Sequence, residues 1–491
     1  MAKITTIIDI GSNSMRMVVF KKTSRFGFHL INETKSKVKL SQGCYENNGY
    51  LQQEPMQRAY DALESFLHIA SNLKSRKILC VATSALRDAP NKKEFLSKVK
   101  NNLKLNIKII SGEEEAYFGA IAAKNLLATD NFTTTDIGGG STEFALIKNN
   151  NIEYKYSLKI GTIRIKELFL DKNDFDGAKQ YITQQLETLP NEFKNINKLV
   201  GLGGTIRALS RIIITNTNYP FDVLHDFRYK TTETNILFDK IIYANNTTQL
   251  KELGVRKDRY DTIVAGTFIF KTILEFLDIQ TVITSGVGVR EGVYLTDLLR
   301  NSNHKFPANF NLSVRSLLDR FIDDKKQTAY LGNNAAKLFD ILQPLHNLDI
   351  KYKQPLILAS KLHQIGIVLN FYKNSEHSSN FILHGLTYGF THKQRVLIAS
   401  ILKSYKKNLP KQTDIVQYEQ LLPDLQTLRW LSYMFKLNKI LNDEFLRYPY
   451  KYTLENNIFS IRSNKKHYII LDDIKKLKQP SDFVLNFIEE Q

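Results

Sequence analysis

The sequence predicts an α/β protein that continues into a helical C-terminal part, and three observations support this fold class. Short β-rich runs alternate with helix-length segments as far as about residue 300. The pattern beyond that point is typical of amphipathic helices. A glycine loop near the N-terminus recurs 127 positions later. The length of 491 residues is enough for about two to four domains.

Composition excludes several other classes of protein. Hydrophobic residues make up 43% and charged residues 24%, which excludes collagen-like and wholly disordered chains. Cys44 and Cys80 are the only cysteines, too few for a disulfide scaffold or a cysteine-type zinc site. The sequence has no signal-peptide pattern and no run of about 18 apolar residues. We therefore expect a cytoplasmic protein without a transmembrane segment.

Net charge is the unusual bulk property. Lys and Arg number 68 against 49 Asp and Glu, which leaves a net charge of +19. Such a field attracts polyanions, and nucleic acid, anionic lipid and polyphosphate all fit it. A general preference for Lys is the alternative explanation. We expect no specific nucleic-acid partner.

Apolar runs predict a series of buried strands with helices between them. In chain order these strands are Ile4–Ile8, Met17–Phe20, Ile78–Ala82, Ile107–Ile110, Thr133–Ile137, Phe144–Ile147, Leu199–Leu202 and Thr281–Thr284. Residues 301–313 have the Asn, Pro and Ser content of a linker.

The internal repeat is the most informative feature. Asp9–Ser14 aligns with Asp136–Ser141, with Asp, Ile, Gly and Ser in register, and each copy reads as strand, loop, strand. A single copy would be an ordinary hairpin turn, whereas two copies indicate duplicated domains. If the domains face one another, the loops meet at a cleft, where ligands of two-domain proteins usually bind.

Two further glycine turns follow strands, at Gly201–Arg207 and at Ser285–Gly292. Glycine and serine loops present several backbone N–H groups to one point, which suits phosphate. None of the loops has the GxGxxG or Walker spacing, so neither a Rossmann nor a P-loop site is predicted.

The two repeated loops differ in the residues that follow them. Arg16 offers a cation that can form paired hydrogen bonds with phosphate oxygens. Glu143, together with Asp136 and Asp9, offers oxygen ligands for Mg²⁺. The alternative is that these are surface side chains on exposed strand faces.

The segment Ser111–Ala116 contains a candidate catalytic base. Ser111 and Glu114 have the spacing of a capping box, which leaves Glu115 free on the helix face shared with Gly119 and Ala122. Glu115 could accept a proton from water. Alternatively, the three glutamates only stabilise the start of the helix.

Two arginines complete the candidate site. Arg87 follows the strand Ile78–Ala82, and Arg259 precedes a helix. Each could contact an anionic substrate or form an ordinary surface ion pair.

Six motifs together resemble the exopolyphosphatase and guanosine pentaphosphate phosphohydrolase family of the actin-like phosphotransferase superfamily. They occur in family order and at approximately the family spacing: DIGSNSMRM at Asp9–Met17, ATSALRDA at Ala82–Ala89, ISGEEEA at Ile110–Ala116, DIGGGSTE at Asp136–Glu143, GLGGT at Gly201–Thr205 and GVREG at Gly288–Gly292.

The resemblance implies two actin-like (ribonuclease H-like) α/β domains with an interdomain cleft, followed by an all-α domain related to His-Asp metal phosphohydrolases. We place the domains at residues 1–125 and 126–300, the linker at 301–313 and the helical domain at 314–491. The family is expected to release terminal orthophosphate from polyphosphate or guanosine pentaphosphate, and a homodimer is expected.

The resemblance also implies roles for individual residues. Glu115 corresponds to the family's catalytic glutamate and would activate water, with Mg²⁺ near Asp136 and Glu143 and Arg16 as a charge clamp. The residues expected to bind phosphate are Gly11, Ser12, Asn13, Ser14, Gly138, Gly139, Gly140, Ser141, Gly203, Gly204 and Thr205.

The helical domain departs from the His-Asp pattern, because Gln364 follows His363 where an aspartate ligand would stand. A second hydrolytic centre is therefore not expected, and we interpret this domain as a binding and dimerisation surface. The histidines that could still form a cluster are His346, His363, His377, His384 and His392.

Two alternatives to the hydrolase remain open at this point. An actin-like kinase would bind ATP tightly and need an acceptor. A regulator would bind polyphosphate or an alarmone nucleotide without cleaving it. The motifs do not rank polyphosphate against guanosine pentaphosphate, because both end in the same phosphate groups.

Overall fold

The computed structural model describes residues 4–44, 46–404 and 409–489. The chain divides into two compact units, Met1–Phe310 and Asn311–Gln491. The boundary between them falls inside the segment 301–313 that the sequence predicts as a linker.

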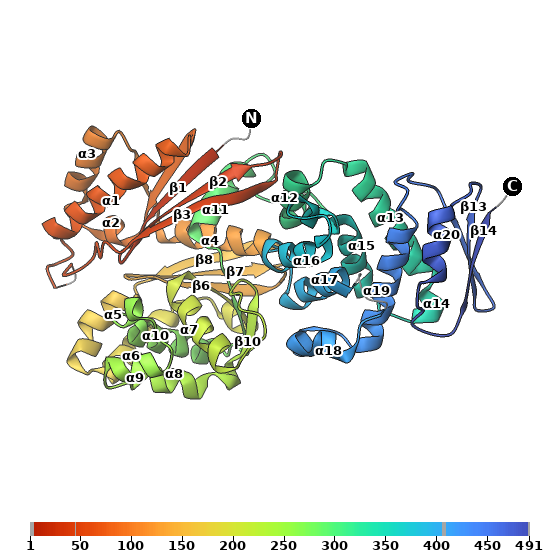
Figure 1. Cartoon of the computed structure of the whole chain (residues 1–491). Helices are drawn as coiled ribbons and strands as arrows, with labels where there is room; N and C mark the ends of the chain where they lie inside the picture. Colours follow the sequence, from red (N-terminus) through yellow and green to blue (C-terminus); the bar gives the residue numbers. More distant parts are fainter. Residues whose placement is uncertain (1–3, 45, 405–408, 490–491) are drawn as a thin grey trace. The chain divides into compact units, whose positions relative to one another are not determined.

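The first unit contains two sheets with matching topology (Figure 1). The strand orders are β3-β2-β1-β4-β5 and β10-β11-β9-β6-β7-β8. In each sheet an antiparallel three-stranded meander is extended by two strands parallel to its first strand. The second sheet has one further edge strand, β10, which is antiparallel to β11. The repeat seen in the sequence is therefore a repeat of topology.

All eight predicted strands are present; six are longer than expected, one has the expected bounds, and the strand expected at Ile107–Ile110 ends one residue earlier. The first sheet comprises β1 (Ile4–Ile10), β2 (Met15–Lys22), β3 (Phe28–Ser36), β4 (Lys77–Ala82) and β5 (Ile107–Ile109). The second comprises β6 (Phe132–Ile137), β7 (Thr142–Lys148), β8 (Asn151–Leu158), β9 (Lys198–Leu202), β10 (Phe227–Lys230) and β11 (Thr281–Thr284). The strands that the sequence analysis missed, β3, β8 and β10, lie at sheet edges, where half-exposed side chains give no continuous apolar run.

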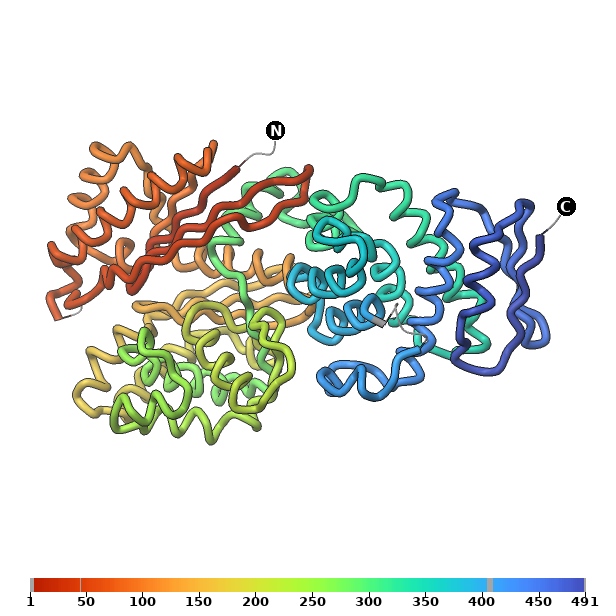
Figure 2. The backbone as a smooth tube through the Cα atoms, viewed as in Figure 1, coloured from red at the N-terminus to blue at the C-terminus, as the bar shows by residue number. Residues whose placement is uncertain are grey.

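Helices cover both faces of the first sheet. One face packs against α1 (Gln53–Asn72), α2 (Ser84–Asp88) and α3 (Lys92–Leu103). The other face packs against α11 (Val289–Leu298), whose Tyr294 ring contacts those of Phe20 and Phe28 with centroid distances of 4.5 and 4.7 Å. Helix α11, from the end of the unit, thus covers one face of the sheet that contains the first strands of the chain, as the backbone trace in Figure 2 shows.

The second sheet is also covered on both faces. Ala145 and Ile147 pack toward α4 (Gly112–Leu126), whereas Phe144 and Leu146 point to the opposite layer, as strand alternation requires. That layer comprises α5 (Thr162–Leu168), α6 (Phe175–Leu186), α7 (Gly203–Asn216), α8 (Asn235–Ile242), α9 (Thr247–Glu252) and α10 (Ile263–Phe276). Short 3₁₀ turns in this unit are η1 (Leu170–Lys172), η2 (Asn191–Asn195), η3 (Thr231–Glu233) and η4 (Lys257–Arg259).

The second unit is a helical domain with its own apolar core. Its α-helices are α12 (Leu312–Phe321), α13 (Lys325–Ile341), α14 (Gln343–His346), α15 (Lys353–Leu362), α16 (Asn374–Gly385), α17 (His392–Ser404), α18 (Gln412–Ile415), α19 (Leu425–Ile440) and α20 (Tyr468–Lys475). The 3₁₀ turns are η5 (Ile350–Tyr352), η6 (Ile365–Val368) and η7 (Val416–Leu421).

The expectation of an all-α domain needs one correction. Beyond Ile440 the chain also forms a small sheet of β12 (Lys451–Glu455), β13 (Ile458–Ser463) and β14 (Val484–Glu489). Asn456 and Asn457 join the first two strands with φ angles of 51° and 62°, values that suit a tight hairpin turn. This Asn-Asn pair between β-branched and aromatic residues is the signal that the sequence analysis overlooked.

Across the described residues, no helix combines the length and the apolar character that crossing a membrane requires.

Candidate active site

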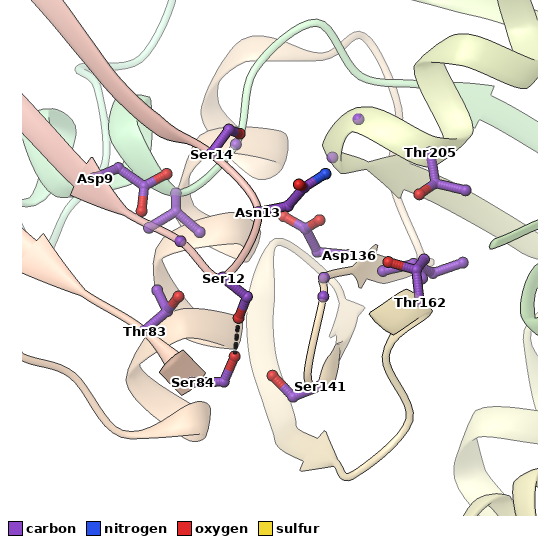
Figure 3. Close-up of a pocket in the computed structure, with 18 of the residues that line it drawn as sticks. Asp9, Ser12, Asn13, Ser14, Thr83, Ser84, Asp136, Ser141, Thr162 and Thr205 are labelled. Atoms are coloured by element: carbon purple, nitrogen blue, oxygen red, sulfur yellow. Dashed lines mark hydrogen bonds between the residues drawn. The ribbon is translucent and has the colours of Figure 1, made fainter. Parts of the chain in front are cut away.

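The two repeated loops meet between the two sheets of the first unit. The loop from Gly11 to Ser14 joins β1 to β2, and the loop from Gly138 to Ser141 joins β6 to β7. A Cβ atom placed on Gly139 would lie 2.7 Å from the Cβ atom of Ser12, so glycine is required for this approach. The Ser12 hydroxyl is also within 3.0 Å of the Ser84 hydroxyl (Figure 3).

The start of α7 forms a third wall. Gly203 has a φ angle of +76°, and a side chain there would collide with the carboxylate of Asp136. Gly204 lies against the Arg259 guanidinium. A Cβ atom placed on Gly204 would lie 2.5 Å from the Nη2 atom of Arg259. The free N–H groups at the start of this 14-residue helix favour an anion in front of them.

These loops enclose a cavity of about 160 Å³. It brings together most of the site residues predicted from the sequence: Asp9, Gly11, Ser12, Asn13, Ser14, Arg16, Glu115, Asp136, Gly138, Gly139, Ser141, Gly203, Gly204, Thr205 and Arg259.

Three predicted residues lie outside the cavity lining. The Gly140 carbonyl accepts a hydrogen bond from Arg164 Nε at 3.0 Å. Arg87 lies behind Glu115, and Glu143 is buried beside Ser157. Arg87 is therefore placed to act on Glu115 and Ser141, which line the cavity.

Sequence analysis did not select several lining residues. Six of them lie inside motifs or glycine turns quoted above, so the sequence did contain a signal for them: Thr83, Ser84, Arg207, Gly288, Val289 and Arg290. Thr162 and Thr262 belong to no recognised motif and enter the cavity only through the fold.

The capping box predicted at the start of α4 is confirmed. The Glu114 N–H donates to Ser111 Oγ at 3.0 Å, and the Ser111 N–H donates to Glu114 Oε2 at 3.0 Å. Glu114 also accepts from Lys108 at 2.7 Å, on the outside of the helix. The cap therefore occupies Glu114 and leaves Glu115 to face the cavity.

Glu115 is held by one arginine and repelled by several carboxylates. Arg87 Nη1 donates to Glu115 Oε2 at 3.2 Å, and Arg87 Nη2 donates to Ser141 Oγ at 3.4 Å. Burial raises the pKa of Glu115 well above its ordinary value; repulsion by Glu143 raises it further, and Arg87 opposes both. A carboxylate in this environment is a stronger base than one in water.

Three other carboxyl groups lie around it. Burial raises the pKa of Asp9 to about 6, although Arg290 lowers it. Burial likewise raises the pKa of Asp136, and it raises the pKa of Glu143 to about 7 despite the hydrogen bond that Ser157 Oγ donates to Glu143 Oε1 at 2.8 Å. Asp136 and Glu143 lie opposite one another on β6 and β7, as Asp9 and Arg16 do on β1 and β2.

These carboxylates are chemically suited to Mg²⁺. All offer hard oxygen donors, and Glu143 Oε2 is buried without a hydrogen-bond partner among the described residues. No three His, Cys, Asp or Glu side chains in the described part of the chain converge closely enough to form a complete metal cage. The arrangement fits an ion held by one or two carboxylates, water and phosphate oxygens.

Four arginines line the cavity and supply positive charge. Arg16 and Arg290 donate to the same Glu33 oxygen, at 3.2 and 2.7 Å. Arg207 Nε donates to the Ser285 carbonyl at 2.9 Å, and burial lowers the pKa of Arg207 to about 10, which leaves it charged at neutral pH. Arg259 is the fourth.

Ion pairs also bridge the two halves of the unit near Arg259. Asp261 accepts from Lys37 and from Lys39, each at 3.1 Å, and Asp258 lies 3.7 Å from Lys35. Lys35 lies at the end of β3 and the other two lysines follow it, whereas the aspartates flank Arg259. These pairs therefore connect the first half of the unit to the segment that carries a cavity arginine.

The second unit does not assemble a His-Asp centre in its described part. His363 is buried; its Nδ1 atom lies 2.9 Å from the Ser360 carbonyl, and burial lowers its pKa to about 4. His346 is likewise buried and accounted for by backbone groups, with Nε2 2.9 Å from the Phe339 carbonyl.

Sequence comparison relates the chain to known proteins. Residues 18–301 match the Ppx/GppA phosphatase family, and residues 311–469 match domain III of that family. A guanosine-5′-triphosphate,3′-diphosphate pyrophosphatase from Photobacterium profundum is 27% identical over 415 residues, covering 82% of this chain and 80% of the relative. The enzyme of the same name from Aeromonas hydrophila is 29% identical over 406 residues, covering 80% and 79%.

Solved structures show the same fold. A Ppx/GppA family member from Aquifex aeolicus is 27% identical with a TM-score of 0.52, over 62% of this chain and 99% of that protein. An exopolyphosphatase from Cytophaga hutchinsonii is 22% identical with a TM-score of 0.57, over 62% and 100%. The predicted fold class, two actin-like α/β domains followed by a helical domain, is confirmed.

Proposed function

Because this chain belongs to the Ppx/GppA phosphatase family, we propose that it releases orthophosphate from the end of inorganic polyphosphate or from the 5′ end of guanosine pentaphosphate. The observation that carries the proposal is the position of Glu115. Its carboxylate faces a cavity that is lined by four arginines and by the N–H groups of glycine loops. A base thus lies beside a site built for phosphate.

Glu115 is the group that activates water in this proposal. Arg87 donates to its Oε2 atom, which leaves Oε1 free to accept a proton from a water molecule. The water then attacks the terminal phosphorus in line with the bond to the leaving phosphate. Because its pKa is raised, Glu115 takes up that proton more readily.

The loops and arginines bind and orient the terminal phosphate. Backbone N–H groups of Gly11–Ser14, Gly138–Ser141 and Gly203–Thr205 donate to its oxygens. Arg16, Arg259 and the other cavity arginines neutralise negative charge as it shifts to the leaving group.

We assign Mg²⁺ to Asp136 and Glu143, with Asp9 beside them. When bound, the ion supplies positive charge to the phosphate oxygens and aligns them. The buried Glu143 oxygen that lacks a hydrogen-bond partner supports this assignment.

Names of relatives support both substrates. Two relatives at 27% and 29% identity are pyrophosphatases of guanosine-5′-triphosphate,3′-diphosphate. The Cytophaga hutchinsonii protein of the same fold is an exopolyphosphatase. We therefore propose terminal-phosphate hydrolysis as the shared activity.

The test is orthophosphate release with Mg²⁺, with long polyphosphate and guanosine pentaphosphate offered separately. Glu115→Gln keeps the size of the side chain but removes the base, and kcat is expected to fall roughly 10²–10⁴-fold. Glu113→Gln, an exposed change in the same helical turn, is the matched control and should retain activity.

Each outcome has a consequence. Release that is lost only in Glu115→Gln supports the mechanism, and the ratio of the two kcat/KM values identifies the preferred substrate. Binding without release by folded wild-type protein would support a regulator, and release that needs ATP and an acceptor would support a kinase.

A further inference from the structure

The first unit contains a second and larger cavity, far from the catalytic loops. It has a volume of about 500 Å³. It lies where β1 and β4 begin, beside the turn between β2 and β3 and the end of α11. We propose that this cavity is a binding site for oligophosphate anions.

Its charge is strongly unbalanced. Five cationic side chains line it, those of Lys22, Arg25, Arg76, Lys77 and Arg300. Asp297 is the one carboxylate among the lining residues, and it is shared by Lys77 at 2.5 Å and Arg300 at 3.6 Å. Positive charge therefore remains in excess, and an anion with several charges would reduce the mutual repulsion.

A buried hydroxyl in the cavity wall is a second, independent observation. Tyr294 is 2% exposed, and its hydroxyl has no hydrogen-bond partner among the described residues. Its ring packs against those of Phe20 and Phe28, with centroid distances of 4.5 and 4.7 Å, and these contacts hold the side chain in place.

The cavity is separate from the candidate active site. None of its lining residues lines the catalytic cavity. Along β1, the five residue steps from Ile4 to Asp9 span about 16 Å at roughly 3.3 Å per residue. Helix α11 joins the two sites, because Arg290 in its first turn lines the catalytic cavity and Asp297 near its end lines the second one.

The lining indicates the class of ligand. Three of the five cations are arginines, whose planar groups bind phosphate through paired hydrogen bonds. Phe26, with the Arg25 guanidinium 5.0 Å from its ring centroid, adds an aromatic wall. Inorganic oligophosphate and the phosphate groups of a nucleotide share the chemistry that this lining recognises.

The test counts bound ligand on full-length protein that carries Glu115→Gln, so that hydrolysis does not consume the probe. Equilibrium dialysis is performed with tripolyphosphate and, separately, with guanosine 5′-diphosphate 3′-diphosphate. Adding Arg25→Ala and Arg76→Ala, two exposed changes, should remove one equivalent of bound ligand per chain. Lys93→Ala with Lys100→Ala removes the same charge from α3, outside both cavities, and should remove none.

The outcomes distinguish an inorganic phosphate ligand from a nucleotide ligand, and a failure of this proposal from a failure of the proposed function. Loss of one equivalent with both probes supports a site that recognises phosphate groups alone. Loss with the nucleotide but not with tripolyphosphate supports a site that also recognises the base. Unchanged stoichiometry in the Arg25 and Arg76 double variant, and also in Arg76→Glu, would overturn the proposal. This readout does not depend on hydrolysis, so it stands apart from a failure of the proposed function.

Discussion

Four largely buried carboxyl groups, those of Asp9, Glu115, Asp136 and Glu143, lie around one cavity of the first unit. Burial raises the pKa of each, because the charged form loses water that the protein replaces only in part. Arginines supply partial compensation, as Arg87 does for Glu115. At the scale of single residues, the charged forms of these four carboxyl groups are therefore unfavourable, and a bound cation is suited to stabilise them.

These raised pKa values predict a pH dependence of stability in protein kept free of divalent metal. The pKa of Glu143 is about 7 in the folded state against an ordinary value of 4.5, so the folded state binds the proton more tightly. The contribution of Glu143 to the free energy of unfolding should then be highest below about pH 4.5 and should fall as the pH rises to about 7. The full effect of this one group is roughly 3 kcal/mol.

Glu143→Gln removes the titrating group and keeps an acceptor for Ser157. Denaturant unfolding in EDTA at pH 5 and pH 8 should show a smaller decrease in stability for this variant than for wild type. The control is Glu153→Gln, on the exposed neighbouring strand β8. An equal decrease in wild type and Glu143→Gln would contradict the prediction.

Elements of the first unit bring these residues together at their ends. Strands β1 and β6 end at the two repeated loops, and α7 and α11 begin beside them, so backbone N–H groups gather at one place. The approach is close enough to exclude side chains at Gly139 and Gly203. Glycine is thus a requirement of element packing at these points as well as of local conformation.

Gly203→Ala tests this packing against Gly254→Ala. Both glycines have positive φ, +76° and +87°, so alanine strains the backbone at each by about 1–2 kcal/mol. Only at Gly203 does the added methyl group also meet Asp136; nothing lies within 4 Å of the Gly254 position. We expect a larger decrease in melting temperature and at least a tenfold loss of kcat/KM for Gly203→Ala.

Gly254→Ala should keep near-normal activity with a modest decrease in melting temperature. Equal effects of the two variants on activity would show that contact with Asp136 is unimportant.

The chain as a whole combines a duplicated α/β unit with a helical unit, and each has its own apolar core. Within the first unit, the two halves are connected by α4 and α11 and by the ion pairs of Asp258 and Asp261. Exposed pairs of this kind are worth about 0–1 kcal/mol each. The two pairs on Asp261 hold the segment that carries Arg259 against the first half of the unit.

Asp261→Asn is therefore expected to lower kcat/KM by about three- to tenfold at low salt, the range that 1 kcal/mol allows. The defect should shrink at 0.5 M salt, because screening already weakens the pairs in wild type. Asp171→Asn is the matched control, since its pair with Lys166 at 2.6 Å lies within one half and has similar exposure. A comparable loss in Asp171→Asn, or a defect independent of salt, would contradict this interpretation.

The sequence by itself determined the features that depend on short stretches of chain. Periodicity predicted the buried strands, the repeat predicted two matching sheets, and the spacing of Ser111 and Glu114 predicted the cap that leaves Glu115 free. The resemblance of six motifs predicted the family that the comparisons confirmed. These features are local because hydrogen bonds and side-chain faces repeat over two to four residues.

Only the tertiary structure decided which distant residues share the cavity. Thr162 and Thr262 carry no motif, Arg87 reaches Glu115 and Ser141 from another element, and the Lys37 pair with Asp261 joins positions 224 residues apart. The edge strands and the C-terminal sheet were likewise missed, because half-exposed strands lack a continuous apolar run. Periodicity reports which face of an element is buried, whereas packing of whole sheets and helices decides what that face meets.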